Sequence, residues 1–340
     1  MNRRGIILIG VLLLATSSLL ALSVGTARIP LDSIAGILIS RVPFIGSLPE
    51  SQPSGWETIV MDIRLPVVIM AMLAGAALSA SGASLQGLFK NPLVDPFIIG
   101  ISAGGAFGWV LALIVTIDST GWWVQWFRAS LSFAGAITAV TAAYLIARTG
   151  SRVPVTNLLL AGVAISASLT AATQFGIYLL VEDPRPVMIS LLGTCSNSRW
   201  GEILVVAPVV LISLPALIFL SRDLNAFSMG EEEARGVGVN VERSKFLILA
   251  VASLLAAVTV PFCGMIGFVG LMVPHMVRRF MGPDHRWLIP GSFLFGSSFL
   301  ILCDMFSRSI MDRIVPLGMV TGFLGGLFFL YLIAAGRRSG

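Results

Sequence analysis

Apolar residues form long continuous runs along this chain, and charged residues stand mainly between the runs. The first run reads IILIGVLLLATSSLLAL and follows two arginines. A stretch of about 20 apolar residues is long enough to cross the hydrocarbon core of a bilayer as a helix, whereas a membrane β-barrel needs short strands of alternating polarity. The pattern therefore predicts an all-α polytopic membrane protein.

Interruptions of these runs by proline, glycine and charged residues predict ten transmembrane helices. They cover residues 6–25, 59–86, 94–115, 129–147, 155–181, 202–220, 246–262, 264–281, 288–306 and 315–335. The seventh and eighth are separated only by Pro261, Gly264 and Gly267, which interrupt a single long run. Small residues follow the first run, as in a signal peptide, but its length favours a retained span.

The basic residues indicate an orientation. When the N-terminus is cytoplasmic, most of the 22 lysines and arginines fall in cytoplasmic segments, as the positive-inside rule requires. An even number of spans then places both termini in the cytoplasm. Two glycine series, Gly100, Gly104 and Gly108, then Gly322 and Gly326, have the spacing that lets helices approach closely in lipid, inside the bundle or between protomers.

Composition excludes several function classes. The chain is 56% hydrophobic and 11% charged, with a mean hydropathy of +0.93. Its net charge of +5 is spread among loops, which predicts topology determinants and contact with membrane lipid but no nucleic acid. The three cysteines have no metal-binding spacing, and no catalytic constellation is readable, so we expect no metal site and no catalytic residue. Few titratable groups lie within the spans, which disfavours the alternative class, a secondary carrier for a small solute.

One stretch comes close to a nucleotide-binding loop. GASLQGLFKN places Gly82 and Gly87 at the required spacing, but Leu88 and Phe89 stand where Lys and Ser or Thr must follow. We therefore expect no cofactor in this chain, and any ATP-driven work needs a separate subunit.

The connection between the second and third predicted spans contains two prolines. Pro92 and Pro96 disfavour helix at the preceding residues, so Asn91 and Asp95 are expected in a non-helical turn. Asp95 is placed to cap the next helix, with Pro96 as its first residue. The turn is either a plain connection or a constriction on a path through the bundle.

These and other stretches resemble the FecCD/BtuC family, the membrane subunits of ATP-binding-cassette (ABC) importers for iron–siderophore, haem and cobalamin. The matching stretches are DIRLPVVIMAMLAGAALSASGASLQGLFKNPLVDPFIIGISAGGAFG at 62–108, NLLLAGVAIS at 157–166, LLGTCSNSRW at 191–200, MGEEEARGVGV at 229–239, GMIGFVGLMVPHMVRRFMGPDHRWLIPGS at 264–292, CDMFSR at 303–308 and PLGMVTGFLGGLFFLYLI at 316–333. They occur in the family's order and cover nearly all of the chain from residue 59.

The resemblance implies a single transmembrane permease domain over 1–340 with a BtuC-like, type II importer bundle of ten helices. It implies a homodimer in the inner membrane of a prokaryote, around a central path. Two ABC ATPase subunits, which bind ATP and Mg²⁺, would sit inside, and one extracytoplasmic binding protein would dock outside. Family gates match Asn91 and Leu93 after the second span and, by a looser match, Val155 and Thr156 before the fifth. Val155 replaces a polar residue of the family.

The resemblance also implies arginines that dock the binding protein. Arg64 of IRLP and Arg308 of DMFSR match family positions, where the guanidinium pairs with carboxylates. The alternative is that they are interface arginines that extend toward water. Val67 stands where the family often has a second arginine, so that contact is absent or comes from another residue. The available replacements are Arg41 and Arg313.

A further departure from the family is IVPLG at 314–318, where the family commonly has a glutamate near Val315. The substrate implied is a bulky metal chelate, with iron–siderophore first, then haem or cobalamin, while small oxyanions stay open. Thr170, Gln174 and Tyr178 repeat at helical spacing on the fifth span and either line the path or pack against helices.

The most polar stretch of the chain is SMGEEEARGVG, in a segment at about 225–243 between the sixth and seventh spans. Ser228 and Glu231 have capping-box spacing, and negative charge in a first turn suits the helix dipole. Gly236 or Gly238 can end the helix in a left-handed conformation. The residues of this capped cytoplasmic helix match the family's coupling helix, which contacts the ATPase. They are Ser228, Met229, Gly230, Glu231, Glu232, Glu233, Ala234, Arg235, Gly236, Val237 and Gly238.

Overall fold

Helices make up nearly all of the regular structure. The computed structural model describes residues 2–25, 27, 29–40, 55–116, 119, 121–150, 152–180, 183–310 and 315–336. Its helices are α1 Arg3–Ser23, α2 Leu31–Ser40, α3 Trp56–Thr58, η1 Ile59–Arg64, α4 Leu65–Leu88, η2 Pro96–Ile99, α5 Ile101–Val115, α6 Trp122–Ala147, α7 Val155–Leu180, α8 Arg185–Leu191, α9 Trp200–Phe219, α10 Ser221–Met229, α11 Glu231–Gly236, α12 Val241–Cys263, α13 Val269–Met281, α14 His285–Ser309 and α15 Leu317–Gly336. No strand occurs within these ranges, which confirms the all-α fold class.

Eight helices among the described residues are long and apolar enough to cross a membrane, counting Trp56–Leu88 as one. Two of the ten predicted spans correspond to helices that are too short to be counted among these eight. α5 has 15 residues and α13 has 13, so they reach only about 22 and 20 Å of a hydrocarbon core of about 30 Å. The structure therefore has a multi-pass bundle but does not confirm the count of ten.

Both short helices begin inside the bundle at a change of backbone direction. α5 follows Gly100, which has φ +97°, and α13 follows Phe268, which has φ +68°. The predicted break between the seventh and eighth spans is confirmed, because α12 ends at Cys263. Pro261, however, lies within α12, and the interruption comes from the residues after it. The predicted cap is also confirmed: the Asp95 side chain accepts a hydrogen bond from the Phe97 N–H at 2.9 Å.

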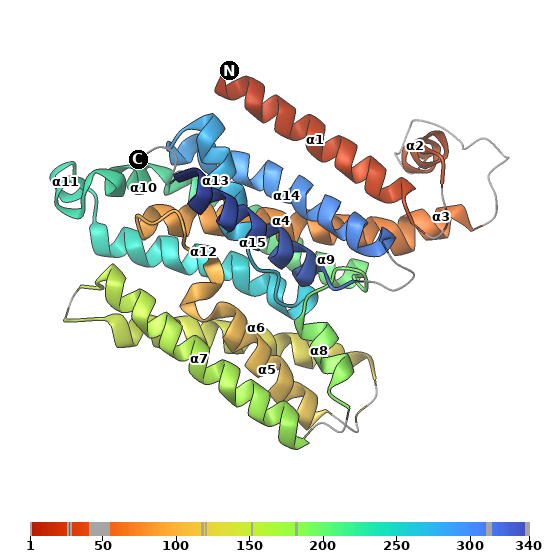
Figure 1. The fold of residues 1–340 in the computed structure, drawn as a ribbon, viewed down its shortest axis with the longest axis horizontal. Helices are drawn as coiled ribbons and strands as arrows, with labels where there is room; N and C mark the ends of the chain where they lie inside the picture. Colours follow the sequence, from red (N-terminus) through yellow and green to blue (C-terminus); the bar gives the residue numbers. More distant parts are fainter. Residues whose placement is uncertain are drawn as a thin grey trace.

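The long axes of most helices run along the bundle, with α4 at its centre (Figure 1). α4 packs against α14, α12, α13 and α9. Small residues make these contacts possible. A Cβ at Gly82 would overlap the backbone of Gly270, and one at Gly87 would overlap the ring of His285. The glycines that imitate a nucleotide-binding loop therefore serve helix packing.

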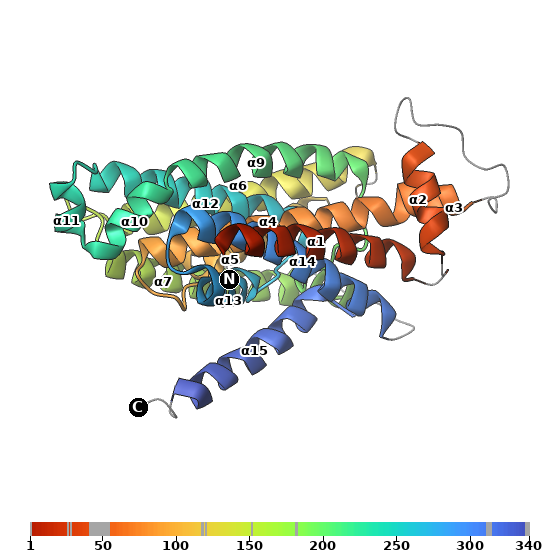
Figure 2. The same ribbon diagram turned by 90° about the horizontal axis from the view of Figure 1, so that it is seen from above.

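α7 lies along one edge of the bundle, and α15 projects away from it (Figures 1 and 2). The first glycine series packs as expected, because Gly104 and Gly108 lie against the backbone of α6. In contrast, a Cβ at Gly322 or Gly326 would meet no described atom within 4 Å. That face of α15 therefore has no packing partner in the described part of the protomer.

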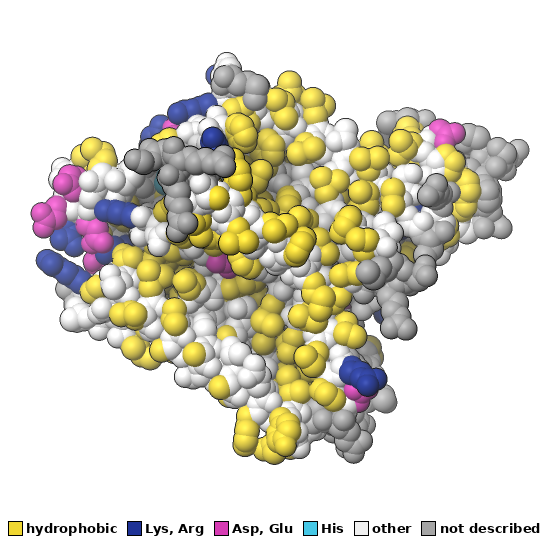
Figure 3. Space-filling view, viewed as in Figure 1, with side chains coloured by type: hydrophobic (Ala, Val, Ile, Leu, Met, Phe, Trp, Pro, Cys, Tyr) yellow, Lys and Arg dark blue, Asp and Glu magenta, His cyan; other side chains and the backbone are white. Residues whose placement is uncertain are grey.

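Charged side chains gather at the end of the bundle that carries α10 and α11, whereas the flank in this view is largely hydrophobic (Figure 3). We call this end the charged end. The start of α1 lies there too, since Arg3 pairs with Asp284 in the α13–α14 turn at 3.3 Å. This separation of charged from hydrophobic surface suits a bundle whose flank faces lipid and whose end faces water.

Candidate functional site: the charged end and the opposite cavity

The polar stretch between α9 and α12 folds into two short helices, α10 and α11. They are separated by Gly230, whose φ of 147° and ψ of 158° interrupt the helical path. The predicted capping box does not form. Ser228 lies within α10, and its hydroxyl donates to the Asn225 carbonyl at 2.6 Å. The first residue of α11 is Glu231, and its cap residue, Gly230, has no side chain to accept a hydrogen bond.

The other end of α11 is closed as the sequence predicts. Gly238 has φ +89°, and its N–H donates to the Arg235 carbonyl at 2.9 Å. The Val239 N–H reaches back to the Ala234 carbonyl at 3.0 Å. These two bonds form a Schellman motif, which needs a left-handed residue at this place. Of the two candidate glycines, Gly238 takes that role, because Gly236 is still helical.

α11 has one buried side and one exposed side. Ala234 is 1% exposed, whereas Glu232 and Glu233 are exposed. Two large apolar side chains next to the helix, Met229 and Val237, are also exposed, at 71% and 69%. This side of α11, with its acidic side chains between Met229 and Val237, is therefore available for contact with another protein.

Ion pairs join α11 to the first turns of α12. Lys245 Nζ lies 2.8 Å from Glu231 Oε2, and Arg235 Nη2 lies 3.7 Å from Glu242 Oε1. Glu242 Oε1 accepts no hydrogen bond from a described residue, yet Lys245 Nζ also lies 3.6 Å from it. We therefore treat its contacts with both cations as electrostatic. Because the Lys245 side chain is only 9% exposed, its pairs are screened less than ordinary surface pairs.

The two predicted gate segments lie on different elements. Asn91 and Leu93 are in the turn after α4, where the Asn91 side chain accepts from the Leu93 N–H at 2.9 Å, and Leu93 is 48% exposed. Val155 and Thr156 begin α7, where Val155 is half-buried and Thr156 is exposed. Val155 and Leu88, the last residue of α4, border the same small cavity. The start of α7 and the end of α4, which leads into the first gate segment, thus lie near each other within one protomer, while the gate role of both segments stays a prediction.

The two predicted docking arginines, Arg64 and Arg308, are largely enclosed within the protomer. Arg64 is 4% exposed and donates to the carbonyls of Leu22 and Ser23 at 2.6 and 3.3 Å, and to that of Ala27. It therefore closes the C-terminal end of α1, where carbonyls lack helical partners. This contact is what the protomer shows for Arg64, and its docking role stays a prediction. A binding protein would have to displace these carbonyls before it could pair with the guanidinium.

Arg308 is also largely enclosed. Its Nε donates to Asp304 Oδ2 at 2.9 Å, its side chain is 14% exposed, and the Asp304 side chain is 1% exposed. Arg41 and Arg313, the candidate replacements for a second arginine, lie outside the described residues. Val67 is buried, at 3% exposure. Val315 donates its N–H to the Ser307 carbonyl at 3.2 Å and so connects the start of the α15 segment to α14.

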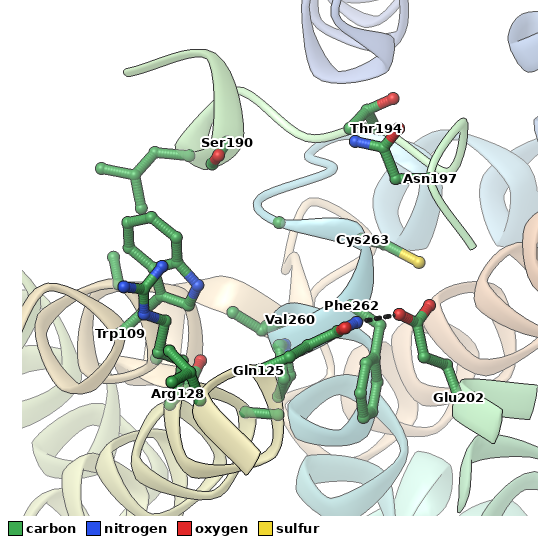
Figure 4. Close-up of a pocket in the computed structure, with 18 of the residues that line it drawn as sticks. Trp109, Gln125, Arg128, Ser190, Thr194, Asn197, Glu202, Val260, Phe262 and Cys263 are labelled. Carbon is green, nitrogen blue, oxygen red and sulfur yellow. Dashed lines mark hydrogen bonds between the residues drawn. The ribbon is translucent and has the colours of Figure 1, made fainter. Parts of the chain in front are cut away.

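A cavity of about 710 Å³ lies between α5, α6, α8, α9 and the last turn of α12. Figure 4 shows residues that line it. Because α11 contacts the first turns of α12, this cavity lies at the other end of that helix. Polar side chains line it. Gln125 donates to Glu202, and Arg128 Nε donates to the Thr116 hydroxyl at 2.9 Å. Sequence patterns do not predict this cavity, because its polar residues come from distant segments with no common motif. The sole local signal is the polar pair Gln125 and Arg128, placed just before a predicted span.

The predicted path residues share one side of α7. Thr170, Gln174 and Tyr178 are all exposed in the protomer, with Tyr178 at 84%. Their helical spacing therefore does not reflect packing inside the protomer. This placement leaves that side of α7 available to a path or to a second copy.

At the charged end, Asp284 connects three elements. Burial alone would raise the pKa of its carboxyl group, but the Asn225 amide, the Arg286 N–H and the charges of Arg286 and Arg3 together lower that pKa. The Asn225 amide donates at 2.7 Å and the Arg286 N–H at 3.1 Å. The carboxylate thus holds α1 and α10 to the start of α14.

Comparisons with known proteins cover nearly the whole chain. The model of the FecCD transport family matches residues 12–335. The cobalamin import system permease protein BtuC of Halobacterium salinarum is 41% identical over 292 residues, which cover 86% of this chain and 78% of that protein. The hemin transport system permease protein HmuU of Yersinia pestis is 34% identical over 87% of this chain and 92% of its own length. An inward-facing structure of a metal-chelate type ABC transporter superposes with a TM-score of 0.84 at 27% identity, covering 98% of this chain and 99% of that one.

Proposed function

The chain belongs to the FecCD transport family, and from that premise we propose that it is the membrane-spanning permease subunit of an ABC importer for a bulky metal chelate. The observation that carries the proposal is the family match over 12–335, which includes the coupling, gate and docking segments alike. In this proposal the whole chain is one permease domain of the inner membrane, with both termini in the cytoplasm. It has no catalytic residue and no cofactor of its own.

The partners follow from the same proposal. Two copies of the chain surround the path, two ABC ATPase subunits bind ATP and Mg²⁺ on the cytoplasmic side, and a binding protein delivers the chelate outside. The charged end supports the cytoplasmic assignment, because its basic residues follow the positive-inside rule. The exposed Met229 and Val237 beside the acidic face of α11 offer the ATPase apolar and charged contacts.

The proposed path between two copies and the known relatives both bear on the substrate class. A path between two copies suits a large chelate, and the names of the two relatives concern cobalamin and hemin. The family resemblance favours iron–siderophore, and the relative at 41% identity adds cobalamin at the same rank. A secondary carrier for a small solute is the weaker alternative, because few titratable groups lie within the spans, and the enclosed pair of Asp304 and Arg308 lies near the end of α14.

The first experiment tests the assembly and its energy source. The chain is co-expressed with a candidate ATPase and purified, and the complex is reconstituted in liposomes with a candidate binding protein. We expect co-purification and uptake that needs both ATP and the binding protein. The panel of labelled solutes is a ferric siderophore, cobalamin, haem and molybdate. Uptake driven by an ion gradient without ATP would favour the secondary carrier, and uptake of molybdate alone would overturn the bulky substrate.

The second experiment tests α11 as the coupling helix. The Ala234 N–H donates to the Gly230 carbonyl at 3.1 Å, so Ala234→Pro removes this bond and distorts the helix. We expect uptake to fall about tenfold or more, while ATP hydrolysis continues and the bundle stays folded. The control, Ala234→Ser, keeps the N–H and nearly the same volume, and it should retain uptake. Normal uptake by the proline variant would contradict the coupling role.

A further inference from the structure

In the segment before α7, two side chains of α12 form hydrogen bonds with the N–H and the carbonyl of one residue, Val153. The Val153 N–H donates to Glu242 Oε2 at 3.1 Å, and the Val153 carbonyl accepts from Lys245 Nζ at 3.3 Å. Val153 is itself buried, at 4% exposure. It lies two residues before Val155, the start of the predicted gate segment. The position of this segment is therefore set by two charged side chains of α12.

The same lysine also reaches α11. Lys245 Nζ donates to Glu231 Oε2 at 2.8 Å, so one ammonium group binds a carboxylate of α11 and a carbonyl of the α7 entry. Glu242 connects the same two places, because it accepts from Val153 and lies 3.7 Å from Arg235 of α11. Two parallel connections thus join α11 to Val153 across the first turns of α12.

Lys245 also lies near the end of α4, which leads into the turn with the other predicted gate segment. Lys245, Val153 and Val155 border a small cavity together with Leu88, which ends α4 three residues before Asn91. Tyr144 of α6 borders the same cavity and packs edge-on against Phe246 of α12. The lysine thus lies where α11, the entry of α7 and the end of α4 come together.

We propose that Lys245 and Glu242 form a clamp that transmits the movement of α11 to the predicted gate segment at the start of α7, acting as positioning residues. The clamp is defined as Glu231, Lys245, Glu242 and the peptide groups of Val153. A buried ammonium that loses its partners is costly, so the lysine must keep its bonds to α11 and to Val153 when either moves. A displacement of α11 by the ATPase therefore displaces the entry of α7 with it. This inference rests on the proposed function, since it requires the ATPase to act on α11.

The test measures movement at the gate without a transported substrate. Thr156 is exposed, and the native cysteines Cys195, Cys263 and Cys303 are buried, so Thr156→Cys offers one accessible thiol among the described residues. The complex with the ATPase is labelled by a membrane-impermeant maleimide, with and without ATP and vanadate. We expect the labelling rate of Thr156→Cys to change at least about fivefold with nucleotide.

Adding Lys245→Met to Thr156→Cys removes the charge and keeps a stem of similar length. We expect the rate of ATP hydrolysis to stay within about twofold of the parent. The ratio of the labelling rates with and without nucleotide should fall to about one. If Lys245 only stabilised the fold, Lys245→Met would lower both the rate of ATP hydrolysis and the nucleotide-dependent change of the labelling rate. Lys245→Arg keeps the cation and should restore most of the change.

Arg243→Met is the matched control, because Arg243 carries the same charge on the same turn and is exposed. It should leave the nucleotide-dependent change intact. Glu242→Leu should weaken the change, and Glu242→Gln should weaken it less, because its amide oxygen can still accept from the Val153 N–H although it no longer attracts Arg235. A full nucleotide-dependent change in the Lys245→Met variant would overturn the clamp. Absence of any change in Thr156→Cys with native Lys245 would instead count against the proposed function, so the two failures are distinguishable.

Discussion

α4 and α7 are both long apolar helices, yet they occupy opposite environments. We compare an apolar stretch of 18 residues in each. In the segment that contains α4, 61% of these residues are buried, whereas in α7 only 17% are. α4 carries glycines that touch neighbouring backbones, whereas α7 exposes large side chains such as Phe175 and Tyr178. In lipid, helices associate through close packing rather than through a hydrophobic drive. α4 therefore acts as the packing centre, and α7 keeps a free face for other contacts.

The largest expected effect comes from disrupting the packing of α4. Gly82→Leu places a side chain where the Gly270 backbone lies, and backbone cannot move aside as a flexible side chain can. We expect a loss of more than about 3 kcal/mol of stability, seen as little folded, monodisperse protein in detergent. The control is Gly326→Leu on α15, whose site has no described atom within 4 Å. Equal yields of both variants would contradict the central role of α4.

A pair of glycines on α7 tests the same contrast within one helix. A Cβ at Gly162 would lie 2.7 Å from the Ile98 carbonyl oxygen, whereas one at Gly176 would lie 3.6 Å from the nearest Val110 atom. We expect Gly162→Ala to destabilise the protein by about 1–3 kcal/mol. Gly176→Ala should be neutral or stabilising by up to about 1 kcal/mol, since alanine favours helix. Thermal unfolding in detergent measures both, and equal melting temperatures would show that α7 has no tight contact at Gly162.

The smallest effect is expected at the rim of the bundle, where solvent screens the contacts. The pKa of Asp284 is lowered, so its carboxylate stabilises the folded state above the unfolded pKa of about 3.9. This contribution is lost as pH falls through the lower folded pKa. Asp284→Asn should cost less than about 1 kcal/mol at pH 7, and the cost should shrink as the pH falls below about 4 and as salt is added.

The control for this prediction is Glu232→Gln, which removes an exposed carboxylate from the same end of the bundle. Thermal unfolding is measured for both variants and the parent at pH 7 and pH 3. A difference between Asp284→Asn and the parent that grows as the pH falls would contradict the assigned direction of the shift.

Local sequence predicted those features that depend on local chemistry. Asp95 caps η2 because its carboxylate reaches the Phe97 N–H two residues away. The left-handed Gly238 ends α11 because glycine has no Cβ to oppose that conformation. The all-α class, the break after Cys263 and the short polar helix follow from the same kind of signal, and the family motifs identified the family over nearly the whole chain.

The predicted capping box was wrong, and other features depend on contacts that the local pattern does not show. Ser228 and Glu231 have the spacing of a capping box, but α10 includes Ser228, and the break comes at Gly230. Arg64 has the chemistry of a docking arginine, but the end of α1 lies close enough to take its hydrogen bonds. The predicted eighth span becomes the short α13 because Phe268, packed against Gly325, turns the chain inside the bundle.

The amino-acid sequence alone is enough to establish a multi-pass helical membrane protein of the FecCD transport family with one polar helix between its spans. Long apolar runs and local turn chemistry act over a few residues, so they can be read along the chain. Three-dimensional packing was needed to establish that α4 is central, that Arg64 is enclosed and that Lys245 joins α11 to Val153. Such contacts join residues far apart in the chain, and they depend on which helix faces which, a choice that spacing within one helix does not encode.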